Sequence, residues 1–130
     1  MQFMTQEWAE AYTSLWNNDD VITKKLKHFS SVFKYSVKDR EEIEPLIIKI
    51  ENGVCTSYGT KEDFNPKEIE YAISADAQDW KKVFDEATGI KEALHIKGFD
   101  FKGPKFKALS NKSGLQRGVE LMAQMQGVKV

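Results

Sequence analysis

The stretch LIIKIENGVCTSY, residues 46–58, decides the fold, because it predicts two paired strands and the turn that joins them. Before the turn, apolar side chains recur at every second position, at Leu46, Ile48 and Ile50. This period of two is typical of a half-buried strand. Asn52-Gly53 follows at once and favours a tight hairpin, since both residues tolerate a positive φ. The second strand carries Val54, Thr56 and Tyr58.

Two more alternating runs flank this hairpin. The first holds Phe33, Tyr35 and Val37, and the second follows a polar loop (residues 59–67) and holds Ile69, Tyr71, Ile73 and Ala75. We expect these four strands to form an antiparallel meander, in which each strand pairs with the next. A fifth strand is expected over residues 95–102, with a bulge at Gly98 that changes which face points inward.

Apolar residues at helical spacing lie on both sides of the predicted strands. Thr5 is a candidate N-cap, residues 17–20 separate two helices, Asp76 and Asp79 mark the start of a third, and Gly89 is its expected end. A short helical turn is expected after Gly103-Pro104. The apolar stripes of these helices contain Trp8, Ala11, Tyr12, Leu15, Trp16, Ile22, Leu26, Phe29, Trp80, Val83, Phe84, Ala87, Ile90, Leu94, Phe106, Leu109, Leu115, Val119, Leu121, Met122 and Met125.

Length and composition limit the class of protein. The chain has 130 residues, 41% of them hydrophobic and 30% charged, with a formal net charge of -1. These values predict one globular domain over residues 1–130 and argue against a disordered tail or a dedicated nucleic-acid binder. A single cysteine, Cys55, excludes an intrachain disulfide, and the first residues lack the pattern of a signal peptide. We therefore expect a cytoplasmic protein.

Groups that carry catalysis are few. The sequence has no H-E-x-x-H, G-x-S-x-G or phosphate-binding loop motif, and we expect no cofactor and no metal. Cys55 is a candidate nucleophile in combination with a distant His28 or His95, but it also fits a small buried residue. An acidic cluster, with Asp39, Glu41, Glu42 and Glu44, fits either a cation site or a solvated loop.

Charge is unevenly distributed along the chain. Residues 91–117 hold seven basic and two acidic side chains, an excess of +5, so the remainder carries -6. Phe99, Phe101 and Phe106 accompany this basic segment, so stacking on single-stranded nucleic acid is one interpretation and a core with outward lysines is the other.

Three stretches together resemble the sterol carrier (SCP-2-type sterol-transfer) family, in particular its stand-alone, single-domain prokaryotic members. They are residues 7–12 (EWAEAY), residues 69–75 (IEYAISA) with the following Asp79-Trp80, and the pair 96–98 (IKG) and 101–103 (FKG). The resemblance implies an α+β fold, in which helices cover one side of a five-stranded, mainly antiparallel sheet. It also implies an apolar tunnel between the two layers that holds a lipid such as a sterol, a fatty acid or a fatty acyl-CoA.

This resemblance and the apolar pattern suggest which residues form the tunnel wall and its mouth. The expected wall consists of Phe33, Tyr35, Ile48, Ile73, Phe84, Phe99, Phe101, Leu115, Val119, Met122 and Met125. The lysines expected to meet anionic headgroups at a membrane are Lys102, Lys105, Lys107 and Lys112.

We therefore expect a non-catalytic protein that binds or transfers a lipid. Two alternatives remain open: a small enzyme acting on an acyl thioester through Cys55 or His95, and a module whose apolar groove accepts a partner's amphipathic helix.

Overall fold

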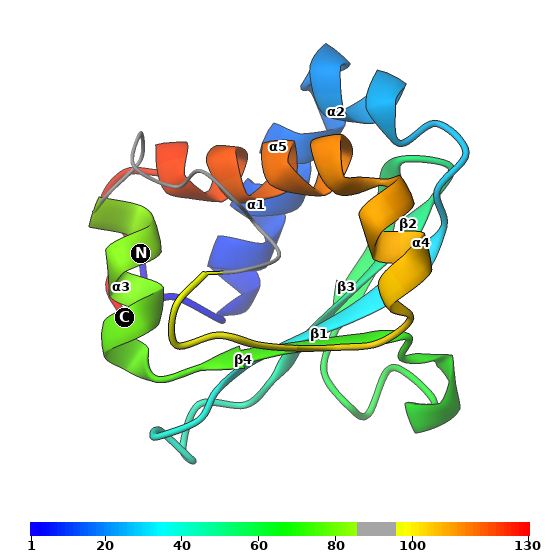
Figure 1. Ribbon diagram of the computed structural model, residues 1–130. Helices are drawn as coiled ribbons and strands as arrows, with labels where there is room; N and C mark the ends of the chain where they lie inside the picture. The colour runs from blue at the N-terminus through cyan, green and yellow to red at the C-terminus, as the bar shows by residue number, and fades with distance from the viewer. Residues whose placement is uncertain (86–95) are drawn as a thin grey trace.

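A five-stranded sheet forms one layer of the protein, and helices form the other (Figure 1). The computed structural model describes residues 1–85 and 96–130. The strands are β1 (Ser31–Val37), β2 (Leu46–Glu51), β3 (Val54–Gly59), β4 (Tyr71–Ala75) and β5 (Asp100–Lys102). The helices are α1 (Gln6–Asn17), α2 (Asp20–Lys25), α3 (Ala77–Asp85), α4 (Lys105–Ser110) and α5 (Lys112–Gln124), with a 3-10 turn η1 (Pro66–Glu68).

The strand order β3-β2-β1-β4-β5 confirms a mainly antiparallel sheet but shows that the predicted meander is wrong. β4 does not pair with β3; it lies parallel to β1, with Tyr71 beside Phe33 and Ala75 beside Val37. Residues 60–70 carry the chain from the end of β3 back to the start of β1, where the Glu70 amide donates to the Val32 carbonyl. Alternation of side chains cannot reveal this return, because it is the same for parallel and antiparallel neighbours.

The hairpin between β2 and β3 is confirmed. Asn52 and Gly53 both have positive φ, at 49° and 81°. Gly53 is also required by space, since a Cβ there would lie 2.7 Å from the carbonyl oxygen of Leu26. The register shifts by one residue between Lys49 and Ile50.

Helices α1, α2 and α3 start where the sequence predicts, and α3 has an additional hydrogen bond to another loop at its start. The Thr5 hydroxyl accepts from the Trp8 amide at 3.2 Å, and the Asp19 carboxylate accepts from the Ile22 amide at 2.9 Å. At the start of α3, the Ala77 amide donates to Asp39, which belongs to the loop between β1 and β2. The expected helix end at Gly89, and the turn with Ile90 and Leu94, lie outside the described residues.

The fifth strand is shorter than predicted. Its regular part is β5, which pairs with β4 through three residues. The residues before it form a turn, in which the Phe99 amide donates to the Ile96 carbonyl and Gly98 adopts a φ of 88°. This left-handed glycine lies in the turn before the strand and does not form a bulge within it.

Helices cover the sheet face that carries Phe33, Tyr35 and Ile48, and α5 packs against α1, α2 and α3. A bidentate ion pair holds α5 to the start of α2: Arg117 donates to both carboxylate oxygens of Asp19, at 3.0 and 2.7 Å. No helix in the two described ranges is long and apolar enough to cross a membrane.

Candidate functional site

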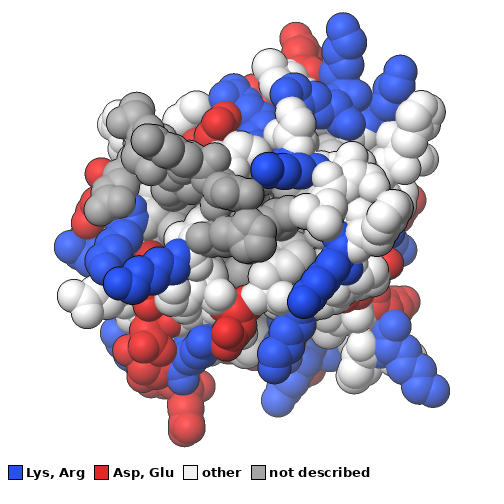
Figure 2. All heavy atoms as spheres, viewed as in Figure 1, with Lys and Arg blue, Asp and Glu red and all other residues white. Residues whose placement is uncertain are grey.

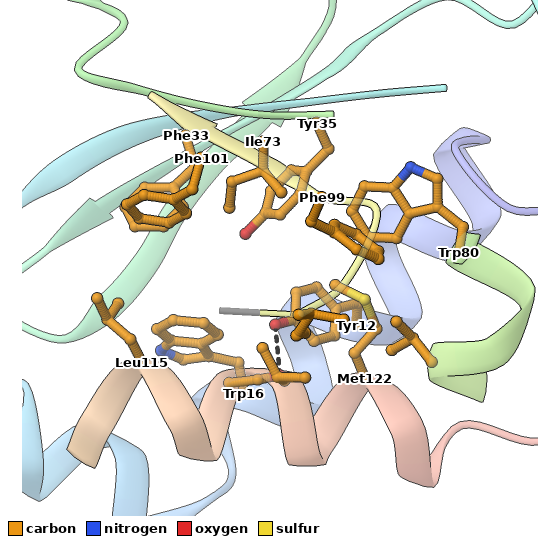
Figure 3. A pocket seen from close by; sticks show the side chains of 14 residues that line it. Tyr12, Trp16, Phe33, Tyr35, Ile73, Trp80, Phe99, Phe101, Leu115 and Met122 are labelled. Carbon is orange, nitrogen blue, oxygen red and sulfur yellow. Dashed lines mark hydrogen bonds between the residues drawn. The ribbon is translucent and has the colours of Figure 1, made fainter. Parts of the chain in front are cut away.

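An apolar cavity of about 60 Å³ lies between the sheet and the helices (Figure 3). Side chains from the strands, from three helices and from the turn before β5 line it. These are Tyr12, Trp16, Phe33, Tyr35, Ile73, Trp80, Val83, Ile96, Phe99, Phe101, Leu115, Gly118, Val119 and Met122. The resemblance implied a tunnel; the space between the layers is a cavity, and a continuous tunnel stays a prediction.

The sheet side of the cavity follows directly from strand register. Tyr35 lies beside Ile73 in the parallel pair, and Ile73 lies opposite Phe101 in the next pair. Register partners point to the same face of a sheet, so these side chains form one continuous wall. Phe33, two residues before Tyr35, extends this wall along β1.

The helix side is built from α1 and α5, whose lining residues recur at helical spacing. The Tyr12 hydroxyl donates to the Gly118 carbonyl at 2.8 Å, which ties the two helices together. Gly118 also allows close packing, because a Cβ there would lie 3.0 Å from the Trp16 ring. The indole N–H of Trp16 donates to the Gly53 carbonyl at 2.9 Å and so fixes this ring against the hairpin turn.

Trp80 of α3 closes one end of the cavity. Its indole N–H donates to the Ser36 carbonyl at 2.9 Å. Its ring meets Phe99 edge to face, with centroids 4.7 Å apart and an interplanar angle of 80°. Such edge-to-face packing is the favoured geometry for two aromatic rings. This end is therefore a rigid aromatic wall.

The cavity contains no charged side chain among the described residues that line it. Its two phenols are buried, and burial raises the pKa of both Tyr12 and Tyr35. Both hydroxyls therefore stay neutral at physiological pH. A cavity of this kind favours hydrocarbon and disfavours an ionised group.

Burial is uneven among the described residues that line the cavity. Most of the α1, α3 and β1 residues are fully buried, whereas Ile73, Ile96, Phe99 and Phe101 on one side and Val119 on the other are half-buried. The less buried part of the described lining therefore lies on β4, on β5 with the turn before it, and on α5.

The structure brings most of the predicted wall residues together. Phe33, Tyr35, Ile73, Phe99, Phe101, Leu115, Val119 and Met122 line the cavity. Ile48 faces the helices opposite Phe33 but is enclosed in solid core. Phe84 and Met125 lie in a separate, more open hollow beside the C-terminal segment. Whether any of these residues binds a ligand stays a prediction.

Sequence reasoning missed several lining residues: Tyr12, Trp16, Trp80, Val83, Ile96 and Gly118. Four of them belong to apolar stripes that the sequence does show, so their helices were expected to face the core. The periodicity of a helix does not distinguish residues in solid core from residues beside a space.

The predicted lysines have different surroundings. Lys107 points inward: its ammonium donates to the Ser30 carbonyl and to Glu70, both at 2.7 Å, and lies 5.2 Å from the centre of the Phe29 ring. Lys102, Lys105 and Lys112 are exposed. Figure 2 shows an uncharged area of surface near α4, bordered by Lys and Arg side chains.

Of the candidate catalytic residues, the structure describes Cys55 and His28. Cys55 is buried in β3, its backbone is held at both N–H and C=O by the Asn17 side chain, and burial raises the pKa of its thiol to about 12. A thiol with this pKa is almost wholly protonated at neutral pH and is a poor nucleophile. His28 is exposed, and His95 lies outside the described residues.

The acidic cluster has structural contacts. Asp39 caps α3, and Glu42 pairs with Arg40, which lowers the pKa of that carboxyl. Within the described residues, no group of three or more candidate ligands could hold a metal ion.

Comparisons with solved structures find the same architecture at low sequence identity. The crystal structure of sterol carrier protein 2 matches with a TM-score of 0.73 and 19% identity, over 95% of this chain and 98% of that chain. A conserved hypothetical protein of Thermus thermophilus, described as a candidate sterol carrier protein, matches with a TM-score of 0.70 and 19% identity, over 98% and 94%. UbiJ-SCP2, a ubiquinone synthesis protein, matches with a TM-score of 0.52 and 10% identity, over 84% and 90%.

No protein-family model and no curated protein sequence matches the chain. At these identities the structural likeness shows the fold alone.

Proposed function

We propose that this chain, which has the fold of sterol carrier protein 2, binds a lipid in the cavity between its sheet and its helices and catalyses no reaction. The observation that carries the proposal is the lining: the fourteen described residues that surround the space are all without charge. The names of the similar structures support a lipid-like ligand, and the resemblance in the sequence supports the same class.

Burial of hydrocarbon is sufficient to hold such a ligand. Each buried CH₂ group contributes about 0.8 kcal/mol, so a long acyl chain gains on the order of 10 kcal/mol before the costs of ordering it. No catalytic group is required for this binding. The high pKa of Cys55 fits a protein without a thiol nucleophile.

The cavity must widen to admit a whole lipid. Its volume of about 60 Å³ is smaller than the ~150 Å³ of a cavity that holds one benzene ring. Binding should therefore move wall side chains apart, and Met122 is suited to this because its unbranched side chain adapts to irregular ligands. Sterol-like lipids, fatty acids and fatty acyl-CoA are the ligands to test first, together with quinone-type lipids.

Lipid exchange is proposed to occur at an anionic membrane through α4. Phe106 and Leu109 on this helix are 85% and 55% exposed, and Lys102 and Lys105 lie beside them in the chain. Exposed apolar side chains flanked by cations are the combination that binds an anionic lipid surface. Lys112 follows at the start of α5.

The first test is native mass spectrometry of protein purified without detergent, followed by organic extraction of the bound material. A co-purifying lipid, displaced by the sterol, fatty acid, acyl-CoA or quinone-type ligands named above, is the expected result. The fluorescence of Trp16 and Trp80, which both line the cavity, gives an independent reading of the same titration.

A clean protein mass with no uptake of any offered lipid would contradict the proposal and favour a module that binds a partner's helix. The enzyme alternative predicts loss of thioester turnover in Cys55→Ala or His95→Ala. For a carrier, we expect both variants to keep lipid binding. The single buried cysteine is consistent with our proposal of a cytoplasmic location.

A further inference from the structure

The hydroxyl of Tyr35 is a polar group that faces the cavity without a partner. The residue is 4% exposed, and Figure 3 shows its hydroxyl pointing away from the sheet towards α5. Across the described part of the chain, this oxygen makes no hydrogen bond to another protein atom, and it borders the cavity: the side-chain polar atom that is fully enclosed without a partner is the indole nitrogen of Trp8. Every other polar side chain in the lining is paired, since Tyr12, Trp16 and Trp80 each donate to a backbone carbonyl.

A hydroxyl that faces an apolar cavity without a protein partner is uncommon, because polar groups inside proteins are usually hydrogen-bonded. The tyrosine is not needed for shape alone, because phenylalanine would fill the same wall beside Phe33 and Trp80. The position of the hydroxyl therefore indicates a partner that arrives from the cavity.

The charge of the lining limits what that partner can be. Burial raises the pKa of Tyr35, so the hydroxyl remains protonated and is available as a donor. The phenol oxygen can also accept, but its unused O–H requires an acceptor on the ligand. An ionised carboxylate would enter a lining with no described cation to pair with it, and the loss of hydration would oppose its entry. An uncharged hydroxyl or carbonyl oxygen accepts the same hydrogen bond without that cost.

We propose that Tyr35 donates a hydrogen bond to an uncharged hydroxyl or carbonyl oxygen of the bound lipid, and that the cavity thereby selects oxygen-bearing neutral lipids over plain hydrocarbons and over ionised fatty acids. This inference rests on the proposed lipid-binding function. It goes further because it assigns the donor, the acceptor class and the residue that discriminates between ligands.

The experiment compares three ligands of equal chain length: hexadecan-1-ol, hexadecane and palmitate at pH 7.5. Each is titrated into the full chain and into Tyr35→Phe, and binding is followed by tryptophan fluorescence and calorimetry. The wild type is expected to bind the alcohol about five- to tenfold more tightly than the alkane, the usual worth of one hydrogen bond. Tyr35→Phe should reduce this preference to about twofold or less and leave alkane affinity unchanged.

Tyr58→Phe is the matched control, because Tyr58 lies on the edge strand β3 outside the cavity lining. It should keep the preference for the alcohol. Circular dichroism and a urea titration establish that both variants are folded.

The outcomes separate the two proposals. Equal loss of alcohol and alkane affinity in Tyr35→Phe, or an unchanged preference for the alcohol, overturns the role of Tyr35 while lipid binding stands. Palmitate as the tightest ligand of both proteins also overturns it. Failure of all three ligands to bind the wild type overturns this inference, and failure of the sterol, acyl-CoA and quinone-type lipids as well overturns the lipid-binding function.

Discussion

Replacement of Phe106 by serine is expected to remove most of the protein's affinity for anionic membranes while leaving the fold intact. Phe106 and Leu109 lie three residues apart on α4, so both are on the outer side of this short helix. Ala108 and Lys107 occupy its inner side, where Ala108 is buried and Lys107 pairs with Glu70. Phe106 therefore contributes little to the core and much to the surface.

The expected loss of membrane affinity follows from the exposed area of Phe106. A phenylalanine side chain offers roughly 200 Å² of surface. Since 85% of the residue is exposed, about 170 Å² is available for transfer out of water. At about 25 cal/mol per Å², complete transfer into hydrocarbon would gain about 4 kcal/mol. Insertion of the ring to the headgroup level gains part of this transfer free energy. A gain of about 1.4 kcal/mol is enough for a tenfold change in affinity.

The assay is co-sedimentation with vesicles that contain phosphatidylserine in phosphatidylcholine, at low and at high salt. Phe106→Ser should bind at least tenfold more weakly than the wild type at low salt. Val21→Ser on α2 is the matched control, because Val21 is also exposed, at 46%, but lies on another helix. High salt should weaken the wild type, since the lysine contribution is screened.

Two results would refute this reasoning. Equal losses in Phe106→Ser and Val21→Ser would show that binding depends on general surface apolarity. Binding that is independent of both phosphatidylserine and salt would exclude a role for Lys102 and Lys105. The unfolding free energy of Phe106→Ser should stay within about 0.5 kcal/mol of the wild type, and a larger change would show that Phe106 packs in the core.

Three further predictions concern the cavity, pH and the hairpin. Val119→Phe adds an aromatic ring beside a cavity of only about 60 Å³, so we expect at least tenfold weaker lipid binding by tryptophan fluorescence. The same substitution should lower the free energy of unfolding by no more than about 3 kcal/mol. The hydrogen bond from Arg117 lowers the pKa of Asp19 in the folded protein. The contribution of this ion pair to folding stability is therefore complete above the unfolded pKa of about 3.9, and it is lost as the pH falls through the lower folded pKa. Asp19→Asn, which keeps a capping side chain, should cost about 1–2 kcal/mol in urea titrations at pH 7, and this cost should shrink progressively as the pH falls below about 3.9. Gly53→Ala should destabilise the protein by about 2–4 kcal/mol, because alanine is strained at a φ of 81° and its Cβ would lie 2.7 Å from the Leu26 carbonyl; Asn52→Gly is the control and should change little.

The sequence predicts those parts of the fold that local chemistry determines. The Asn52-Gly53 turn, the cap at Thr5, the break between two helices at residues 17–20 and the alternation in β1 all follow from interactions within a few residues, and all are confirmed. The pairing of β4 with β1 depends instead on how residues 60–70 cross the end of the sheet. Alternation of side chains does not show which path the chain takes between two strands. A meander, in which each strand pairs with the next, is the simplest arrangement that fits the alternation, and it is wrong here.

In the cavity, too, some lining residues can be predicted from local sequence patterns, and others depend on contacts between distant parts of the chain. Tyr35, Ile73 and Phe101 were found because a strand's period identifies one face, and register then brings them together. Ile48 shares that face but lies in solid core. What separates a lining residue from a core residue is the distance between two layers, which is set by contacts far apart in sequence, such as that of Tyr12 with Gly118.

Those contacts also indicate which part of the wall moves when a lipid enters. Ring contacts of Phe33 with Tyr35 and of Tyr71 with Phe101, together with strand pairing, fix the sheet side.

On the helix side, α5 is held at Arg117 by Asp19 and at Gly118 by the Tyr12 hydroxyl. Beyond these two anchors lie Val119, which is half-buried, and Met122, whose unbranched side chain adapts to irregular surroundings. Opening the cavity at this part of α5 disrupts no strand pairing and neither of the two anchors. The widening that a lipid requires is therefore expected around Val119 and Met122, opposite the donor on Tyr35.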